Sequence, residues 1–295
     1  MPKASSPARK RRKWWRWRFE LGYARILIAE FRIDQIYIYP VRSLGGMAVS
    51  EARITASGSL EGDREWIVTR PDGSLIWQGD IPSMTLLSAR LEGTSLVLQG
   101  HDGTLGPRPA DASRRTAVKQ DGYTLSGFDQ GDAVADWLSA QLRAPCRLVR
   151  TGKEAHRWGG LNPIHAVSLV SLSALNARLT ERGEQPVEVE RFRPNVVLSG
   201  TRAAFAEEAA ECLRFDHVSL ELREPCVRCE LPNISRKDAS RGKQPFKLIG
   251  AMSRERPSAR PASFGTYCTA KGSILRIGMG AIDPISAIWA VASKY

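Results

Sequence analysis

HVSLELREPCVRC, residues 217–229, joins an apolar strand to a closely spaced pair of cysteines. Apolar and polar residues alternate through 217–222, which predicts a β-strand. Cys226 and Cys229 follow that strand, and Arg228 lies between them. The stretch therefore places two thiols and a guanidinium where a strand ends.

Two cysteines at this spacing are compatible with several kinds of site. Structural zinc needs four ligands, usually from two such pairs, and Cys212, His217 and Cys268 do not provide the spacing of a second pair. A thioredoxin-like dithiol would open a helix, which Pro232 discourages. Two ordinary buried cysteines are a third interpretation, and the motif alone leaves all three open.

The second half of the chain combines further strands with long loops. Residues 195–199 (NVVLS) and 273–278 (SILRIG) are predicted strands. Residues 231–263 are rich in Ser, Arg, Lys and Pro, and we interpret them as surface loops around one short apolar segment at 246–249.

The first hundred residues are predicted to be mainly antiparallel β-structure. Residues 33–41 and 51–55 have strand composition, and 64–78 has the pattern of a hairpin whose turn is Pro-Asp-Gly at 71–73. Another strand pair is expected around Glu92-Gly93.

Two segments show helical periodicity, at 131–142 and 171–183. Ser171 is the predicted N-cap of the second helix and Gly183 its C-terminal stop. The turn-rich residues 151–163 between the helices are a plausible domain junction. The predicted fold class is therefore α+β, with two β-rich halves and a barrel or sandwich in the second.

The positive charge of the chain is unevenly distributed. The 295 residues carry a net charge of +12, and residues 1–19 contain eight Lys or Arg and no acid. Subtracting these eight leaves +4, so the body is not strongly basic and nucleic-acid binding by it is not favoured. The arm, with Trp14, Trp15 and Trp17, could bind bases or lipid headgroups, or be a disordered basic extension.

The cysteine count and the hydropathy pattern bear on location. Five widely spaced cysteines are no secreted disulfide framework, which favours a reducing cytoplasmic environment. Residues 161–177 lack charges but are too short and polar to span a membrane, so no transmembrane segment is predicted.

Basic residues recur beside turns and strand edges well before the cysteine pair. They occur in YPVRS (39–43), GDREW (62–66) and RFRPNVVLSG (191–200). These arginines are either solvated and unrelated, or they converge on an anion as bidentate donors.

Taken in order, five motifs resemble the MOSC family with an N-terminal β-barrel domain, the relatives of the mitochondrial amidoxime-reducing component. The motifs are YPVRS, GDREW, QGDIPSM, RFRPNVVLSG and EPCVRC, and the likeness extends from about Ile33 to about Gly278. The resemblance implies a β-rich N-terminal domain at 31–150 and a MOSC β-barrel domain with a few helices at 151–282. A basic arm (1–30) and a tail (283–295) flank them.

The resemblance also implies a molybdenum cofactor, a pyranopterin dithiolene bearing a phosphate. The second cysteine of the motif, Cys229, is the implied metal ligand and catalytic residue, while the role of Cys226 is left open. Molybdenum suits such soft sulfur ligands. The implied cofactor-binding residues are Arg42, Ser43, Arg64, Arg193, Asn195, Arg228 and Cys229.

Some residues depart from the family pattern. Residues 77–79 are Trp-Gln-Gly where the family often has Thr-Gln-Arg, so a basic group is missing. No Trp follows the segment around Phe205 and Glu207. Gly278 is followed by an unfamiliar tail, which leaves the closing strand of the barrel open. His165 is expected to be a capped or buried histidine.

The activity that the resemblance implies is a molybdenum-dependent reduction of N-hydroxylated compounds such as amidoximes and hydroxylamines. Only Cys268 follows Cys229, and no dinucleotide fingerprint is present, so an external flavin, haem or ferredoxin-type protein is expected to supply electrons. The alternative is a non-catalytic MOSC module that carries the molybdenum cofactor or sulfur for another enzyme.

Overall fold

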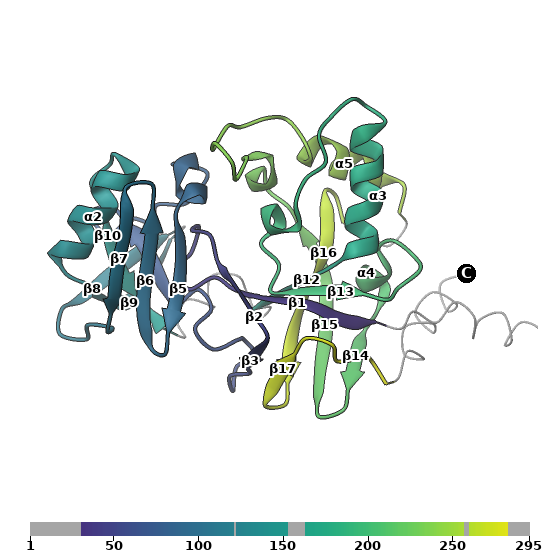
Figure 1. The fold of residues 1–295 in the computed structure, drawn as a ribbon, viewed down its shortest axis with the longest axis horizontal. Helices are drawn as coiled ribbons and strands as arrows, with labels where there is room; N and C mark the ends of the chain where they lie inside the picture. The colour runs from purple at the N-terminus through teal and green to yellow at the C-terminus, as the bar shows by residue number, and fades with distance from the viewer. Residues whose placement is uncertain (1–30, 121, 153–162, 257–259, 283–295) are drawn as a thin grey trace, which may run out of the picture.

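The computed structural model describes residues 31–120, 122–152, 163–256 and 260–282, which form two β-rich halves side by side (Figure 1). The predicted arm, the tail and most of the predicted junction lie outside the described residues.

The C-terminal half is built on a seven-stranded sheet. All its neighbouring strands are antiparallel except β12 and β13, which are parallel. In sheet order the strands are β14 (Cys212–Phe215), β15 (Val218–Val227), β16 (Ser263–Lys271), β12 (Ile164–Ser168), β13 (Val196–Ser199), β1 (Arg32–Ile38) and β2 (Met47–Val49).

The last described residues join the two sides of this sheet. β17 (Ile274–Arg276) pairs with β3 (Glu51–Arg53). Beyond it, the Ala281 N–H donates to the Phe31 carbonyl just before β1, and the Ile282 N–H donates to the Arg214 carbonyl on β14, both at 2.7 Å. The closing segment that the sequence left open is therefore present, and the sheet curls into the predicted barrel.

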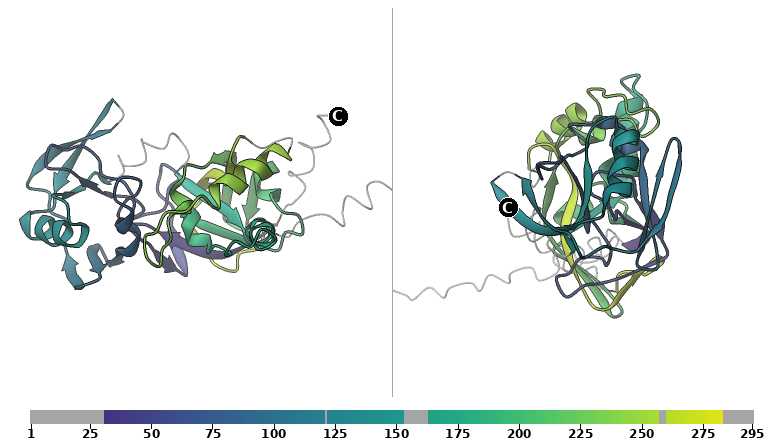
Figure 2. Two further views of the ribbon diagram at one scale, coloured as in Figure 1. Left: turned by 90° about the horizontal axis from the view of Figure 1, so that it is seen from above. Right: turned by 90° about the vertical axis from the view of Figure 1, so that its left-hand side faces the viewer.

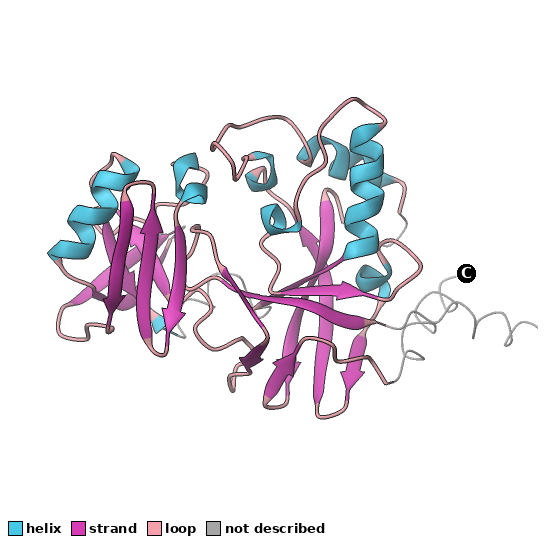
Figure 3. Ribbon diagram, in the orientation of Figure 1, coloured by secondary structure: helices cyan, strands magenta, loops and turns pink. Residues whose placement is uncertain are grey.

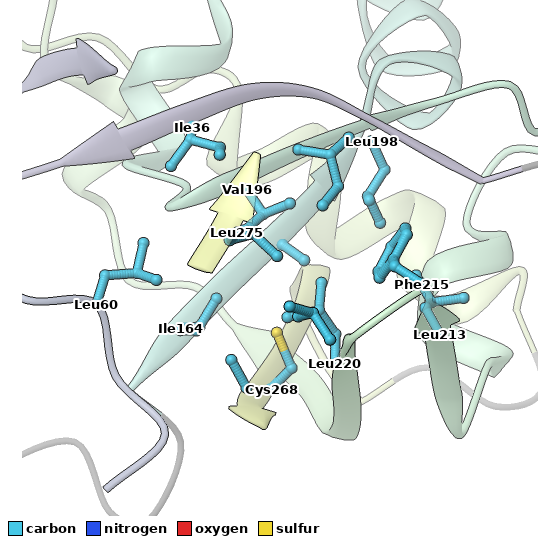
Figure 4. Close-up of a cluster of buried hydrophobic side chains, with 14 of the residues drawn as sticks. Ile36, Leu60, Ile164, Val196, Leu198, Leu213, Phe215, Leu220, Cys268 and Leu275 are labelled. Carbon is cyan, nitrogen blue, oxygen red and sulfur yellow. The ribbon is translucent and has the colours of Figure 1, made fainter. Parts of the chain in front are cut away.

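Alternation along β15 places its apolar side chains in the barrel core. Val218, Leu220 and Leu222 are buried, and Leu222 pairs in register with Cys268 on β16. Leu220 and Cys268 are drawn among the buried side chains of this core in Figure 4. Burying each large apolar side chain contributes about 1.5–3 kcal/mol. Cys226 is also buried, near the end of the strand, after two irregularities in the pairing of β15 with β16.

Helices cover one side of the barrel: α3 (Leu169–Thr180), α4 (Ala206–Ala209) and α5 (Phe246–Arg254) (Figure 3). The predicted N-cap of α3 was wrong. Ser168 caps the helix, accepting a bond from the Val170 N–H at 3.2 Å, whereas the Ser171 hydroxyl donates to the buried Glu207 carboxylate at 2.9 Å.

The segment at 231–263 contains more structure than expected. The apolar stretch at its centre continues as α5, which buries Leu248, Ile249 and Met252 against the C-terminal half. A 3-10 turn, η4 (Leu231–Asn233), precedes it, and another, η3 (Val189–Phe192), packs against η4.

The N-terminal half holds two smaller sheets and one long helix (Figures 1 and 2). The predicted hairpin is present, because the Ile76 N–H donates to the Val68 carbonyl at 2.9 Å. The elements are β4 (Trp66–Thr69), β10 (Arg147–Arg150), β9 (Tyr123–Asp129) and β8 (Arg115–Gln120) in one sheet, β5 (Ser88–Glu92), β6 (Ser95–Gly100) and β7 (Gly103–Arg108) in the other, η1 (Pro82–Leu86), and α2 (Asp132–Leu142).

The chain order and the spatial halves do not coincide. β1 and β2 come early in the sequence but belong to the seven-stranded sheet of the C-terminal half. The predicted boundary between residues 150 and 151 stays a prediction.

The five cysteines form no disulfide bond in the described part of the chain, and the predicted cytoplasmic location stays a prediction. Within the described ranges, every helix is too short or too polar to cross a membrane.

Candidate functional site

Three of the predicted site residues have left-handed backbone conformations. The φ angles of Ser43, Arg64 and Arg193 are 72°, 56° and 54°. For residues other than glycine, such conformations cost about 1–3 kcal/mol each and persist only where the surroundings fix them. The same three residues were selected from sequence motifs, which marks this region as the candidate functional site.

Arg64 links the two halves. Its Nη1 donates to Asn195 Oδ1 at 3.0 Å and its Nη2 to the Arg193 carbonyl at 3.3 Å. The same guanidinium pairs with Asp63, a fully buried carboxylate that also accepts the Tyr39 N–H at 2.9 Å. One cation from the loop before β4 is thereby fixed against the strand edge that carries Arg193 and Asn195.

Arg193 and Arg64 both approach the ring of Tyr39. The guanidinium of Arg193 is 4.4 Å from the ring centroid and that of Arg64 is 5.2 Å away, so one buried ring contacts two cations. Burial, together with the nearby Arg64 and Arg42 cations, lowers the pKa of Arg193 to about 10. An anionic ligand would be favoured here, because it would stabilise the charged form of Arg193 beside the other two cations.

Arg193 also lines a small polar pocket of about 20 Å³ at the junction of the halves. Three buried atoms of its lining have no hydrogen-bond partner in the described part of the chain: Arg193 Nη2, the Tyr39 hydroxyl and Gln78 Oε1. Buried polar groups are normally paired, so these three atoms are available to a polar ligand.

Asn195 holds three strands in register around the site. Its Nδ2 donates to the Tyr37 carbonyl at 3.2 Å, and its Oδ1 accepts the His165 N–H at 3.3 Å in addition to Arg64. The side chain therefore connects β1, β12 and the start of β13, which explains why it is fully buried.

His165 is buried, as expected from the sequence, and lies beneath the cysteine motif. Its Nδ1 is 3.2 Å from the Phe192 carbonyl and its Nε2 is 3.1 Å from the Phe264 carbonyl. Carbonyl oxygens only accept, so a ring nitrogen bonds to its carbonyl as an N–H donor, and the tautomer decides which nitrogen donates.

Cys226 is fully buried beside this ring. Arg228 Nη1 donates to its sulfur at 3.0 Å, and Nη2 of the same guanidinium donates to the Phe192 carbonyl at 3.0 Å. Burial opposes ionisation of the thiol, but His165 and Arg228 outweigh it and lower the pKa of Cys226 to about 6. A buried thiolate thus balances the guanidinium between the two cysteines.

Cys229 has the opposite environment, because its side chain is exposed. The 3-10 turn η4 follows it, so no α-helix opens at the motif as a thioredoxin-like site would require. Among the described residues, no cluster of three or more His, Cys, Asp and Glu side chains could bind a metal ion without further ligands. The pair therefore divides into one inward and one outward sulfur.

The predicted residues are brought together to different degrees. Arg64, Arg193 and Asn195 are in direct contact, and the charge of Arg42 acts on Arg193. Ser43 is buried, immediately before Leu44, whose carbonyl accepts from Arg193 Nη1. No contact of Cys229 with Arg64 or Arg193 is seen among the described residues.

Sequence reasoning missed the aromatic and amide parts of the site. Tyr39 lies inside the YPVRS motif and Gln78 is the first residue of the QGDIPSM motif, but neither was selected as a site residue. Tyr267, which interacts with Cys226 and whose pKa is raised by burial and by that sulfur, had no motif to mark it.

Comparisons with known proteins match the chain over the range that the sequence motifs cover, with the domains in the same order. The MOSC N-terminal beta barrel domain matches residues 30–145, and the MOSC domain matches residues 153–281. Mitochondrial amidoxime-reducing component 1 of Xenopus laevis is 30% identical, over 92% of this chain and 86% of its own length. The Homo sapiens protein of that name is 28% identical over 83% of this chain and 79% of its own length.

A further relative is larger. Molybdenum cofactor sulfurase of Oryza sativa subsp. japonica is 26% identical over 78% of this chain, but the match covers 32% of that protein. With both domains matched in sequence order and a 30% identical relative aligned over most of both chains, this protein belongs to the MOSC family with an N-terminal MOSC β-barrel domain.

Proposed function

We propose that this protein binds a molybdenum cofactor and reduces N-hydroxylated compounds with electrons from an external donor. The observation that carries the proposal is the convergence of Arg64, Arg193 and Asn195, two of them in strained backbone conformations, beside unpaired buried polar atoms. The name of one relative, molybdenum cofactor sulfurase, supports the choice of cofactor, and the name amidoxime-reducing component supports the choice of substrate.

The chemistry of the site fits a phosphate-bearing, polar ring system. An anionic ligand would offset the mutual repulsion of the arginines, which burial strengthens. The unpaired Arg193 Nη2 and Tyr39 hydroxyl could each bind a polar atom of such a ligand. Arg228 Nε, also buried and unpaired, adds a donor next to the cysteine motif.

In this proposal Cys229 is the protein ligand of the metal, because it is the exposed member of the pair. Cys226 instead keeps Arg228 paired and oriented. The remaining cofactor contacts are assigned to Arg42, Ser43, Arg64, Arg193, Asn195 and Arg228.

When bound, the cofactor supplies the two-electron chemistry that removes oxygen from the substrate. Two electrons and two protons convert an N-hydroxyl group to N–H and water. The protein holds the ring system, neutralises its charge and leaves the thiol face open to a small substrate. The electrons come from a separate flavin, haem or ferredoxin-type protein.

Turnover with a small reductant tests this activity. The full chain, purified from cells that make the cofactor, should reduce benzamidoxime with methyl viologen as the electron source. Cys229→Ala should lose this activity by at least about a hundredfold, since removal of a metal ligand disrupts the centre. Cys212→Ser on β14, outside the site, should leave it unchanged. Equal rates for wild type and Cys229→Ala would contradict the assignment.

The alternative is a carrier that holds the cofactor or sulfur for another enzyme. The match to a sulfurase favours it, but the complete burial of Cys226 leaves Cys229 as the only accessible thiol of the pair. A carrier would contain molybdenum and reduce nothing in the same assay.

A further inference from the structure

A single segment next to the candidate site accounts for the net charge of the chain outside the basic arm. Of the net charge of +12, residues 1–19 contribute eight, which leaves +4. Residues 236–247, called the basic segment here, hold five Lys or Arg and one acid, which is also +4. The remainder of the chain is balanced. The cations are Arg236, Lys237, Arg241, Lys243 and Lys247.

The basic segment borders the site and touches both halves. It begins shortly after η4, which itself begins two residues after Cys229. Arg236 lines the pocket that contains Arg193 and pairs with Glu190 at 3.2 Å. Arg241 Nη2 donates to the Gly79 carbonyl at 2.6 Å, across to the N-terminal half (Figure 1).

Several of its cations are free to meet a partner. Lys237, Lys243 and Lys247 are exposed, and the described residues offer no ion pair to them. The one acid, Asp238, accepts bonds from the Ser240 N–H at 3.1 Å and the Ser240 hydroxyl at 2.7 Å, which close a turn, and its charge also interacts with that of Lys237. Unpaired surface cations of this kind steer a partner of opposite charge.

We propose that the basic segment is the docking surface for an acidic electron-donor protein, an inference that rests on the proposed function. The segment follows Cys229 closely in the chain and Arg236 lines the pocket of Arg193, so a donor bound here would bring its redox group to the candidate site. Opposite charges accelerate encounter and fix orientation, with a steep dependence on ionic strength. A nucleic acid is the less favoured partner, because Phe246, the only aromatic residue of the segment, is half-buried and so offers little surface for stacking.

The test uses a reduced, acidic plant-type ferredoxin as the donor probe. Benzamidoxime reduction by the full chain should fall steeply as salt is added. The variant Lys243→Glu/Lys247→Glu should lower kcat/KM for the ferredoxin roughly tenfold at low salt and flatten the salt dependence. The matched control Arg115→Glu/Lys119→Glu makes the same charge change on β8, at the far end of the N-terminal half (Figure 1), and should behave as wild type.

Methyl viologen separates docking from catalysis. Neither double variant should change the molybdenum content or the methyl viologen-driven rate, since a small reductant needs no docking surface. If wild type itself lacks molybdenum or methyl viologen-driven activity, the proposed function fails. Ferredoxin binding, measured directly by calorimetry at low salt, still decides whether the docking surface exists.

Three outcomes would overturn the docking proposal. One is an unchanged ferredoxin kcat/KM and salt dependence in Lys243→Glu/Lys247→Glu. Another is loss of the salt dependence on deletion of residues 1–19 while the double variant retains it, which would transfer docking to the arm. The third is weakened binding of a single-stranded oligonucleotide by the double variant with ferredoxin turnover intact.

Discussion

Cys226 and Cys229 lie three residues apart in opposite environments. The first is fully buried beside His165 and Arg228, and the second is exposed. The sequence shows the spacing of the two cysteines. It does not show that one sulfur is buried and the other exposed, because this depends on β15 continuing through Val227, so that Cys226 lies on the strand and Cys229 beyond it. The two thiols therefore differ both in burial and in the charged groups around them.

The ionisation of Cys226 can be observed directly. Its pKa is lowered from 9.0 to about 6, so wild type should show a thiolate absorbance step near pH 6 that Cys226→Ser lacks. A depressed pKa stabilises the fold fully above the unfolded value, and this stability is lost as the pH falls through about 6. The unfolding free energy of wild type relative to Cys226→Ser should therefore rise between about pH 6 and pH 9.

Cys268 provides the control for this titration. It is fully buried on β16, and burial raises its pKa, so Cys268→Ala should keep the step near pH 6. A wild-type thiol that titrates only near its ordinary value would contradict the thiolate assignment.

The geometry of Arg193 gives a second prediction at this scale. Arg193→Lys keeps a positive charge but removes the unpaired Nη2 donor and the planar contact with Tyr39. Loss of a charge-assisted bond costs about 1.5–3 kcal/mol, so cofactor retention during dialysis should fall at least about tenfold. The exposed Arg202→Lys is the control and should retain cofactor as wild type does. Equal retention in both variants would remove Arg193 from the site.

At the scale of elements, the alternating strand β15 could be predicted, whereas two mostly buried strands, β12 and β16, could not. β15 was found because its inward and outward residues differ. β12 was missed because all five of its residues are buried, and β16 because most of its residues are, which removes the period of two. α5 was missed because its apolar residues span only a short stretch within a basic, polar segment.

Gly265 tests how tightly these buried strands pack under the site. Its φ is +72°, and a Cβ there would lie 2.5 Å from the Ala166 carbonyl oxygen and 2.7 Å from His165 Nε2. Gly265→Ala should lower the unfolding free energy by roughly 2–4 kcal/mol through conformational strain and collision. It should also shift the absorbance step of Cys226, because the His165 ring must move.

Gly183, after α3, is the matched control. Its φ is +71°, and a Cβ there would have no neighbour within 4 Å. Gly183→Ala should therefore cost only about 1 kcal/mol of conformational strain and leave the Cys226 titration unchanged. Urea unfolding of the two variants compares them, and equal losses would show that the collision at Gly265 is relieved without cost.

At the scale of the whole molecule, the candidate site is shared by segments that are far apart in the chain. Motif order pointed to Arg42, Arg64 and Arg193, and the structure joins the last two across the halves. The contact of the Tyr39 ring with two guanidiniums could not be foreseen, since it exists only once residues 39, 64 and 193 are folded together. The same holds for the contact of Arg241 with Gly79.

A ligand that contacts residues of both halves should stabilise both halves against unfolding. Binding to the native state alone raises stability by about 2.7 kcal/mol when the ligand is at about a hundred times its Kd. Protein from cells that make the cofactor should therefore unfold at a higher temperature than protein from cells that do not, as one transition in calorimetry. Arg64→Met should abolish the difference, whereas Arg90→Met on β5, outside the site, should preserve it. A stabilisation confined to one half would contradict a shared site.

The most direct measurement is the molybdenum content of the purified full chain and of Cys229→Ala, both made in cells that synthesise the cofactor. The account predicts about one molybdenum per chain in wild type, with pterin phosphate in equal amount, and almost none in Cys229→Ala. A wild-type protein free of molybdenum, or a Cys229→Ala variant that carries as much as wild type, would contradict it.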